Sequence, residues 1–350
     1  MNPEITFSDI LITPQYSEIE SRQNIDISSD MGKLKLSLPV ISSNMPQITG
    51  WKMAVEMYMN GGLGILHRFM SVEDNVKEYL NAYNGIEDAK NIITNSQDDF
   101  NYLKYMVGVS IGVKDEEKNR FEKLYGVGAR IICVDIASGH SKLMKEMIQW
   151  LKLNKDIIII AGNIATKEAI VDLEEWGADI AKIGIGGGKV CRTRSNAGVG
   201  VCQLQAIMDV STVAKIPIIS DGAIKTSGDI AKALIFCDAV MVGAVLAGTS
   251  ESPFPAFAEP GTDLTNRTYY KLFGGNASQE NKVANNQSGR FSEGEMIKVP
   301  FKGHCKYLLR EIKDGLQSAL SYSNSKNLSE YRTKVKYSII SSSGQIESKF

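Results

Sequence analysis

Ile157-Ile-Ile-Ile-Ala-Gly162 is an uninterrupted apolar run, and Ile131-Ile-Cys-Val-Asp135 has the same character up to its last residue. Consecutive rather than alternating apolar residues, rich in β-branched side chains, are typical of parallel strands that are buried on both faces. Six more short apolar runs are separated by helical stretches: Leu38–Ser42, Gly62–Leu66, Tyr105–Ser110, Ile180–Ile185, Pro217–Asp221 and Ala239–Gly243. The sequence therefore predicts eight parallel strands.

The helical stretches between these runs carry clear boundary signals. Thr166–Trp176 begins with a threonine that can cap a helix and stops at Gly177, and Ser227–Phe236 is similar. Eight β/α units in one array predict an α/β fold of the (β/α)8 TIM barrel type. The alternative is a doubly wound open sheet, which would normally carry phosphate-binding glycines after its first strand, and none stand there.

The last hundred residues depart from the repeat. Residues 252–303 are too long for a simple connection and include several prolines, so we expect an active-site flap after the eighth strand. The final barrel helix is predicted at about Lys306–Tyr322. The tail Ser323–Phe350 is polar and serine-rich apart from Val335–Ile340, and we expect it to be partly disordered or to pack on a neighbouring subunit. Residues 1–350 are predicted to form a single barrel domain.

Composition argues against several classes of protein. The chain has 39 basic and 40 acidic residues, so its net charge implies no attraction to nucleic acid or to a membrane. It has no apolar run of membrane-spanning length and no signal-peptide pattern at its start. The five cysteines are scattered and only three histidines occur. We therefore expect reduced thiols in a cytoplasm and no zinc site.

Polar and small residues gather where the predicted strands end, which is where barrel enzymes place their chemistry. These positions are Asp135, Asn163, the loop that carries Cys191, Asp221-Gly222 and Gly243-Ala244. Small residues after the seventh and eighth strands favour a phosphate pocket built from backbone N–H groups.

Each of these residues also has a purely structural interpretation. Asp135 could cap the following helix, and Gly222 and Gly243 could serve turn geometry alone. His67 and His140 lie near the same face, but either could be a hydrogen-bonded structural residue, and neither is assigned as a catalytic base.

Cys191 lies in the glycine-rich stretch Gly184–Gln203, and the Thr193 hydroxyl follows two residues later. Glycines allow close approach of backbone or ligand, and a thiol on such a loop is a candidate nucleophile. The alternative is a small buried apolar residue, as most free cysteines are. Cys202 is a rival thiol, but its place beside Val201 and just before a helix suits packing better.

Several motifs occur in an ordered set: Thr6–Pro14, Ser43-Asn-Met45, Gly61–Arg68, Ala161-Gly-Asn163, Gly177-Ala-Asp179, Gly184–Gln203, Ser220-Asp-Gly222, Met241–Gly248, Glu293-Gly294 and Val299–Gly303. On these motifs the chain resembles the IMP dehydrogenase / GMP reductase family over nearly its full length. Gly184–Gln203 is the strongest match and is similar to the family's loop with the catalytic cysteine.

Within the family, the chain resembles the reductase branch. Dehydrogenases usually carry a pair of CBS modules after the second barrel strand, and only 36 residues separate Arg68 from Tyr105 here. The flap lacks the dehydrogenase's Arg-Tyr pair and has Gly289–Glu293 nearby instead. Three further segments look reductase-like: Ser21-Arg22, Ser250–Ser252 and Tyr270–Gly274.

This resemblance implies a GMP reductase activity, in which NADPH-dependent reductive deamination converts GMP to IMP and ammonia. The reaction would pass through a thioimidate between Cys191 and purine C2, with Thr193 and Glu293 relaying the proton to the leaving amine. Two alternatives stay open: an IMP dehydrogenase without CBS modules, which would oxidise IMP to XMP with NAD, and a nucleotide-binding barrel without catalysis.

The resemblance also implies binding roles. The nucleotide would be held by Lys189, Asp221, Gly222, Ala223, Gly243 and Ala244, and from the flap by Gly275, Asn276, Ala277, Arg290, Phe291, Ser292 and Gly294. NADPH would be held by Ser21, Arg22, Arg68, Asp135, Ile136, Ala137, Ile185 and Gly186. Carbonyl oxygens of Gly186, Gly188 and Cys191 would bind potassium. A homotetramer is expected, because the family shares cofactor contacts across subunits.

Four positions depart from the common family pattern. Ala223 stands where a second glycine is usual, and Lys189 where serine is common. Asn276 and Cys202 replace a frequent methionine and a frequent proline. Lys189 could still face the phosphate as a point charge. These departures leave room for an altered purine nucleotide as substrate.

Overall fold

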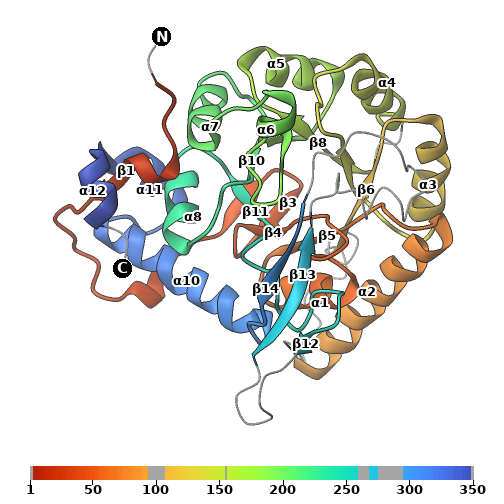
Figure 1. Ribbon diagram of the computed structural model, residues 1–350, viewed down its shortest axis with the longest axis horizontal. Helices are drawn as coiled ribbons and strands as arrows, with labels where there is room; N and C mark the ends of the chain where they lie inside the picture. Colours follow the sequence, from red (N-terminus) through yellow and green to blue (C-terminus); the bar gives the residue numbers. More distant parts are fainter. Residues whose placement is uncertain (1–2, 94–106, 154–155, 259–267, 275–294, 348–350) are drawn as a thin grey trace.

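The computed structural model describes residues 3–93, 107–153, 156–258, 268–274 and 295–347. Eight parallel strands close into a barrel in chain order, with the last strand paired to the first (Figure 1). They are β4 (Val40–Ser42), β5 (Leu63–Leu66), β6 (Val107–Ile111), β7 (Ile131–Asp135), β8 (Ile158–Ile164), β9 (Ile180–Ile183), β10 (Ile218–Asp221) and β11 (Ala239–Val242). The predicted (β/α)8 barrel is confirmed, and the open sheet is excluded because β11 pairs with β4.

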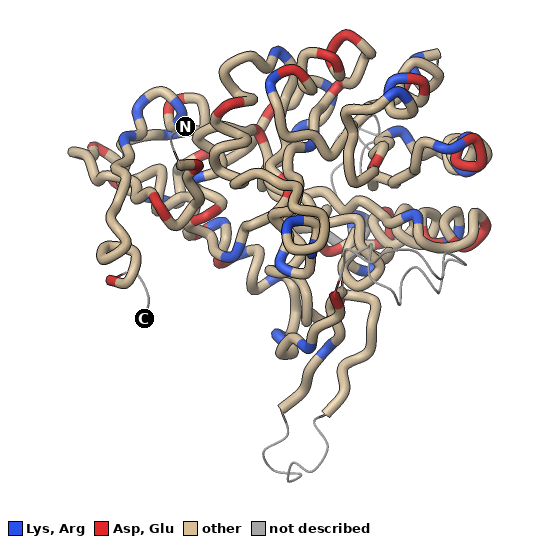
Figure 2. Tube along the Cα trace, turned by 45° about the horizontal axis from the view of Figure 1, so that its top comes forward, with Lys and Arg blue, Asp and Glu red and all other residues tan. Residues whose placement is uncertain are grey.

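Helices cover the outside of the barrel. They are α1 (Trp51–Met59), α2 (Val72–Ile93), α3 (Asp115–Gly126), α4 (Lys142–Leu151), α5 (Lys167–Trp176), α7 (Gln203–Ser211), α8 (Ser227–Ala233) and α10 (Cys305–Tyr322). The short helix α6 (Thr193–Ala197) instead belongs to the loop that carries Cys191. At α5 the Thr166 hydroxyl accepts a hydrogen bond from the Ala169 N–H, and Gly177 ends the helix with a φ of 103°. Helix α8 ends at Ala233, earlier than predicted. Acidic and basic residues are intermixed along the outer helices, as the balanced charge predicts (Figure 2).

The barrel interior is an apolar layer that is closed at one end by a hairpin. Alternate strand residues, such as Ile131 and Cys133 on β7 or Ile158 and Ile160 on β8, form one buried cluster. The hairpin of β2 (Ser29–Met31) and β3 (Leu34–Leu36) contributes Met31, Leu34 and Leu36 to the same cluster. The hairpin therefore seals the end of the barrel at which the strands begin, and the open end is where they finish.

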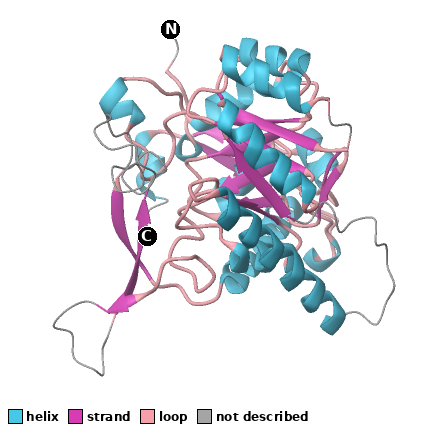
Figure 3. Ribbon diagram, turned by 90° about the vertical axis from the view of Figure 1, so that its right-hand side faces the viewer, coloured by secondary structure: helices cyan, strands magenta, loops and turns pink. Residues whose placement is uncertain are grey.

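The flap region contains a small antiparallel sheet of β12 (Phe257–Ala258), β13 (Tyr269–Gly274) and β14 (Met296–Pro300). The β13–β14 pair projects from the barrel (Figure 3). Lys271 on β13 is buried and donates hydrogen bonds to the carbonyl groups of Thr249 and Ser252, at 2.7 and 2.8 Å. These bonds fix the base of the flap to the segment that follows β11.

Residues 323–347 of the C-terminal tail form regular elements against their own chain, so the expected partial disorder does not hold for this part, while packing on a neighbouring subunit stays a prediction. These elements are α11 (Leu328–Lys334), β15 (Lys336–Ile339) and α12 (Ser342–Glu347). Strand β15 pairs with β1 (Ile10–Thr13), which follows the short 3-10 helix η1 (Phe7–Asp9). Tyr331 is fully buried and its hydroxyl donates to the Ala231 carbonyl. Tyr331 thus anchors the tail to α8 and β15 joins it to the N-terminal arm, whereas Ile339 and Ile346 stay exposed.

No membrane-crossing helix occurs in the described part of the chain, since none of its helices is both long enough and apolar enough.

Candidate active site

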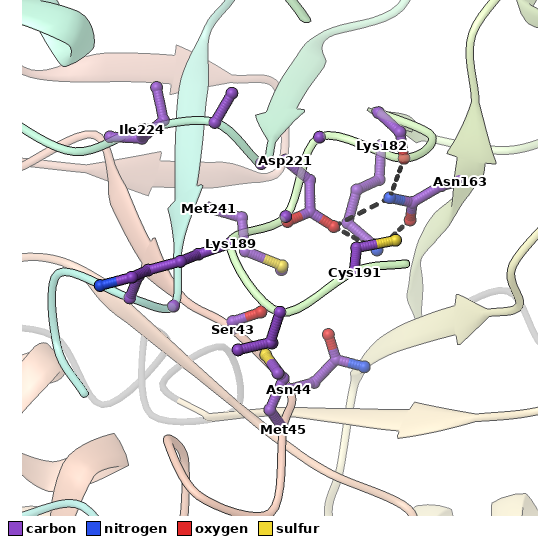
Figure 4. A pocket seen from close by; sticks show the side chains of 18 of the residues that line it. Ser43, Asn44, Met45, Asn163, Lys182, Lys189, Cys191, Asp221, Ile224 and Met241 are labelled. Carbon is purple, nitrogen blue, oxygen red and sulfur yellow. Dashed lines mark hydrogen bonds and ion pairs between the residues drawn. The ribbon is translucent and has the colours of Figure 1, made fainter. Parts of the chain in front are cut away.

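A cavity of about 1060 Å³ opens where the barrel strands end. Its lining comes from the segments after most of the barrel strands and includes Cys191, Asp135 and Asp221. Figure 4 shows the Cys191 thiol at the same side of the pocket as Lys182, Asn163 and Asp221, whereas the Lys189 side chain extends away from them. The cavity is therefore at the face on which the sequence places the chemistry.

Most of the residues with predicted roles line this one cavity. They are Arg68, Asp135, Ile136, Ala137, Ile185, Gly186, Gly188, Lys189, Cys191, Thr193, Asp221, Gly222, Ala223, Gly243 and Ala244. The predicted flap residues Gly275, Asn276, Ala277, Arg290, Phe291, Ser292, Glu293 and Gly294 lie outside the described residues.

Ser21 and Arg22 are not brought to the cavity of their own chain. Ser21 precedes the short 3-10 helix η2 (Arg22–Asn24), and the Arg22 guanidinium lies 5.3 Å from the ring centre of Tyr322 at the end of α10. This pair therefore packs on the outer surface of the barrel.

The loop after β9 presents the thiol. Gly184 passes against the Asp221 backbone with a φ of 147°, where a side chain would clash. The Cys191 N–H donates to the Gly188 carbonyl at 3.1 Å, which closes a tight turn. The Cys191 Sγ and Thr193 Oγ1 are 3.2 Å apart. The turn thus places a nucleophile beside a hydroxyl that can carry a proton.

The same loop is attached to the flap. The Glu295 N–H, just before β14, donates to the Val190 carbonyl at 3.1 Å. The Arg192 guanidinium forms an ion pair with the Glu295 carboxylate at 2.8 Å. Cys191 therefore lies between two residues that contact the base of the flap.

Lys182 is the functional residue that sequence reasoning missed. It points into the barrel from β9, is 1% exposed, and its Nζ lies 2.7 Å from Asp135 Oδ1 and 2.9 Å from Asp221 Oδ2. Its ammonium also donates to Asn163 Oδ1. The Asn163 amide in turn donates to Asp221 Oδ2 and to the Gly184 carbonyl. A lone lysine in an apolar, doubly buried strand was the available signal, because a buried charge needs a partner.

The charges of this network stabilise one another. Burial acts to lower the pKa of the Lys182 ammonium, but the Asp135 and Asp221 carboxylates outweigh burial and raise that pKa above its ordinary value. Burial likewise acts to raise the pKa of Asp135, and Lys182 beside it brings that pKa below its usual range. Asp135 does not cap α4, because Ser141 holds that position and accepts from the Met144 N–H.

The turn after β10 has the geometry that favours glycine. Gly222 and Ala223 have φ values of 113° and 60°, both in the left-handed region. The Ala223 N–H donates to the Gly187 carbonyl at 3.1 Å, so this turn and the cysteine loop are bonded to each other. Lys302 donates to the carbonyls of Ala244 and Val245. Its pKa is lowered by burial and by the nearby charge of Lys189.

Arg68 supplies an unused donor at the other side of the cavity. Its Nε is buried and has no hydrogen-bond partner within the described ranges, while its guanidinium lies 4.9 Å from the Phe69 ring centre. Arg68 also lowers the pKa of Asp135 through its charge. A buried donor without a partner beside a carboxylate fits a polar ligand such as a ribose or carboxamide group.

The two histidines and the rival cysteine have structural surroundings. Burial, followed by the charge of Arg120, lowers the pKa of His67 to about 4, and its Nδ1 accepts from the Phe69 N–H. The His140 Nε2 lies 2.6 Å from Asp172. Cys202 precedes α7, and its N–H donates to Glu4. None of the three is among the residues that line the cavity.

The predicted potassium ligands are partly engaged. The Gly188 carbonyl accepts from the Cys191 N–H, so in this conformation one oxygen of the predicted set is already hydrogen-bonded. Gly186 has a φ of 81° and lines the cavity. No cluster of three or more His, Cys, Asp or Glu side chains suited to a metal occurs among the described residues.

Known proteins resemble this chain over its full length. Residues 4–350 match the family model described as "IMP dehydrogenase / GMP reductase domain". An inosine-5′-monophosphate dehydrogenase from Cryptosporidium parvum is 35% identical, over 98% of this chain and 94% of its own length. A GMP reductase from Acidovorax sp. (strain JS42) is also 35% identical, over 95% of both chains. Relatives of both activities are thus equally similar in sequence.

A solved structure has the same fold. It is a cysteine-to-alanine variant of GMP reductase from Trypanosoma brucei in complex with guanosine 5′-monophosphate. It superposes with a TM-score of 0.89 at 27% identity and covers 100% of this chain and 98% of its own. The barrel, the cysteine loop and these matches lead to one conclusion: the chain belongs to the IMP dehydrogenase / GMP reductase family of oxidoreductases.

Proposed function

We propose that this protein is a GMP reductase that converts GMP to IMP and ammonia with NADPH as reductant. The observation that carries the proposal is the Cys191–Thr193 pair, with its 3.2 Å separation, on a loop lining a nucleotide-sized cavity. The reductase branch is favoured by the sequence after Arg68, where α2 starts at Val72 and the chain is too short for CBS modules before Tyr105. We accordingly propose a single catalytic domain.

The chemistry follows from the nature of the thiol. The Cys191 sulfur adds to C2 of the purine, and the bond from C2 to the exocyclic nitrogen breaks as that nitrogen gains a proton and leaves as ammonia. Thr193 is placed to pass that proton, and Glu293 is the proposed acid that supplies it. When bound, the dinucleotide supplies the hydride that reduces C2. The C2–sulfur bond then breaks, which releases IMP and restores the thiol.

The nucleotide would lie along the Asp221 side of the cavity. Asp221 would accept hydrogen bonds from the ribose hydroxyls, and the N–H groups of Gly222, Ala223, Gly243 and Ala244 would hold the phosphate. Because the Ala223 N–H is bonded to the Gly187 carbonyl, phosphate binding at this donor requires a shift of the cysteine loop. Lys189 would face the phosphate, and the base would be held by Gly275, Asn276, Ala277 and residues 290–294.

The dinucleotide would lie on the Asp135 side. Asp135, Ile136 and Ala137 would face the nicotinamide ribose, and Arg68, Ile185 and Gly186 would line the channel. Because Ser21 and Arg22 lie outside the cavity of their own chain, we propose that they reach the 2′-phosphate of NADPH in a neighbouring subunit of a homotetramer. We also propose that the carbonyl oxygens of Gly186, Gly188 and Cys191 bind potassium.

The second candidate function is an IMP dehydrogenase without CBS modules, favoured by the 35% identity to the C. parvum enzyme. The two candidates use the same thiol but require opposite redox directions. Incubation with GMP and NADPH should consume NADPH and release ammonia. Incubation with IMP and NAD should produce no NADH. Production of NADH and XMP from IMP, with no turnover of GMP, would establish the dehydrogenase instead.

A further inference from the structure

We infer that Lys182 is a positioning residue shared by two binding subsites, holding Asp135 for the dinucleotide ribose and Asp221 for the nucleotide ribose at once. The inference rests on the proposed function, because it takes those two ribose groups as the ligands. What it adds is a physical link between the two subsites through one buried ammonium group.

Strand register places Asp135 and Lys182 in one layer, whereas Asp221 lies two residues beyond Ile219, the residue of β10 that is opposite Lys182. Asp135 on β7 is opposite Gly162 on β8, and Gly162 is opposite Lys182 on β9. All three therefore occupy equivalent inward positions, two residues beyond Cys133, Ile160 and Ile180 of the apolar cluster. Lys182 has to reach across the intervening strand to meet Asp135.

Gly162 makes that reach possible. A Cβ at this position would lie 2.7 Å from the Cβ of Lys182, closer than side chains can pack. With no side chain on β8 in this layer, the lysine stem crosses to β7 and its ammonium meets Asp135 at 2.7 Å. The same ammonium meets Asp221 on β10 from the other side, at 2.9 Å.

The charge arrangement leaves both carboxylates in a defined orientation. Both hydrogen bonds of Asp221 in the described structure, from Lys182 and from Asn163, use Oδ2, so Oδ1 is the oxygen left for a ribose hydroxyl. Without the ammonium, the two carboxylates would lose the cation that lies between them, and Arg68 would remain near Asp135 alone. Like charges so placed do not both stay ionised, and one would take a proton or turn away. The Asp135 and Asp221 carboxylates would then no longer be oriented to accept hydrogen bonds from the two ribose groups.

The neighbouring residues provide matched controls. Asn163 contacts Lys182 and Asp221, and Asp135 is not among its partners. Cys133 lies in the same barrel interior, is fully buried, and does not line the cavity. Asn163→Ala should therefore perturb the nucleotide subsite more than the dinucleotide subsite, because it removes a direct partner of Asp221. Cys133→Ala tests whether a general loosening of the barrel interior is enough to weaken binding.

The experiment is calorimetric binding of GMP, and of NADPH to the GMP-bound protein, in a Cys191→Ala background that prevents turnover. Lys182→Met is expected to weaken both ligands by about tenfold or more, the typical loss for a charged hydrogen-bond network. Asn163→Ala should weaken binding of GMP more than binding of NADPH, and Cys133→Ala should change the affinity for either ligand by less than about twofold. Lys182→Arg should recover part of both affinities.

The double variant Lys182→Met/Asp135→Asn distinguishes a loss of binding caused by misplaced carboxylates from one caused by a damaged fold. It removes one carboxylate with the cation, so the fold should recover, as followed by thermal melting, and GMP binding should recover while NADPH binding stays weak. An effect of Lys182→Met on one ligand only, or an equal effect of Cys133→Ala on both, would overturn the shared role of Lys182. If the Cys191→Ala protein with Lys182 intact binds neither ligand, the proposed function fails and this inference fails with it.

Discussion

Arg192 and Glu295 form an ion pair at 2.8 Å that joins the cysteine loop to the base of the flap, 103 residues further along the chain. The two side chains are 49% and 43% exposed, so the pair adds less than about 1 kcal/mol to the free energy of unfolding. The ion pair matters because it can position the proposed acid Glu293, which lies two residues before Glu295 in the chain.

Arg192→Gln is therefore expected to leave the melting temperature nearly unchanged while lowering kcat by about tenfold, because proton transfer depends on placement of the flap. Glu295→Gln should give the same loss, and the double variant should be no worse than either single one. Additive losses in the double variant would show that the two residues act separately.

Cys191→Ala should abolish turnover, by at least about a thousandfold in kcat, since the nucleophile is removed. Nucleotide binding measured by calorimetry should persist. Cys202→Ala is the matched control, because Cys202 does not line the cavity and its sulfur has no proposed role. Loss of activity in Cys202→Ala with activity kept in Cys191→Ala would show that the chemistry belongs to Cys202 and not to Cys191.

Lys189→Ser should raise the Kd for GMP about fivefold and reduce its dependence on salt, because it removes a cation that faces the phosphate. The kcat should not change. Lys215→Ser, at an exposed lysine beyond α7, serves as the control and should leave binding unaltered. An unchanged salt dependence in Lys189→Ser would exclude Lys189 from the phosphate subsite.

Ala223 has a φ of 60°, which an L-residue adopts at a cost and glycine adopts freely. Ala223→Gly should raise the free energy of unfolding by up to about 1 kcal/mol, because the strain relieved exceeds the entropy gained by the unfolded chain. Ala319→Gly, inside α10, should instead lower it by about 1 kcal/mol. Urea denaturation measures both, and the same sign at the two positions would contradict the strain at Ala223.

His67 should make the protein less stable in mild acid. Its pKa is lowered from 6.5 to about 4 in the folded state, so below pH 6.5 the unfolded chain binds a proton that the folded chain excludes. The stability it contributes is present above the unfolded pKa and falls by up to about 3 kcal/mol as the pH drops toward 4.

His67→Asn keeps an acceptor for the Phe69 N–H but removes the titration. The free energy of unfolding, measured by denaturation between about pH 7 and about pH 5, should therefore fall less steeply with decreasing pH in the variant than in the wild type. Equal slopes would mean that the pKa of His67 is not lowered by folding.

The pattern of apolar residues could be read from the sequence, whereas the pairing register of the strands could not. The doubly buried runs, such as Ile157–Gly162, predicted the number of strands, and the place of the Cys191 loop after the sixth strand followed from that number. Closure of the barrel was decided by the pairing of β11 with β4. Lys182 could not be assigned in the same way, because its partners lie on β7 and β10 and only the strand register brings them together.

Other features depend on contacts that the local sequence does not encode. The tail looks polar, yet Tyr331 and the pairing of β15 with β1 fix it to the N-terminal arm. Ser21 and Arg22 match a family motif, but their place beside Tyr322 depends on how the arm crosses α10. Ala223 is an ordinary residue in sequence, and its left-handed backbone follows from the approach of the Gly187 carbonyl.

The proposed reaction delivers hydride from NADPH to purine C2 after ammonia has left that carbon. NADPH carrying deuterium at the transferable position, incubated with GMP and the wild-type protein, tests it directly by NMR of the purine product. The predicted result is IMP with deuterium at C2 and an equal amount of ammonia. Unlabelled GMP recovered with no oxidation of the dinucleotide, or formation of XMP when IMP and NAD are supplied, would contradict it.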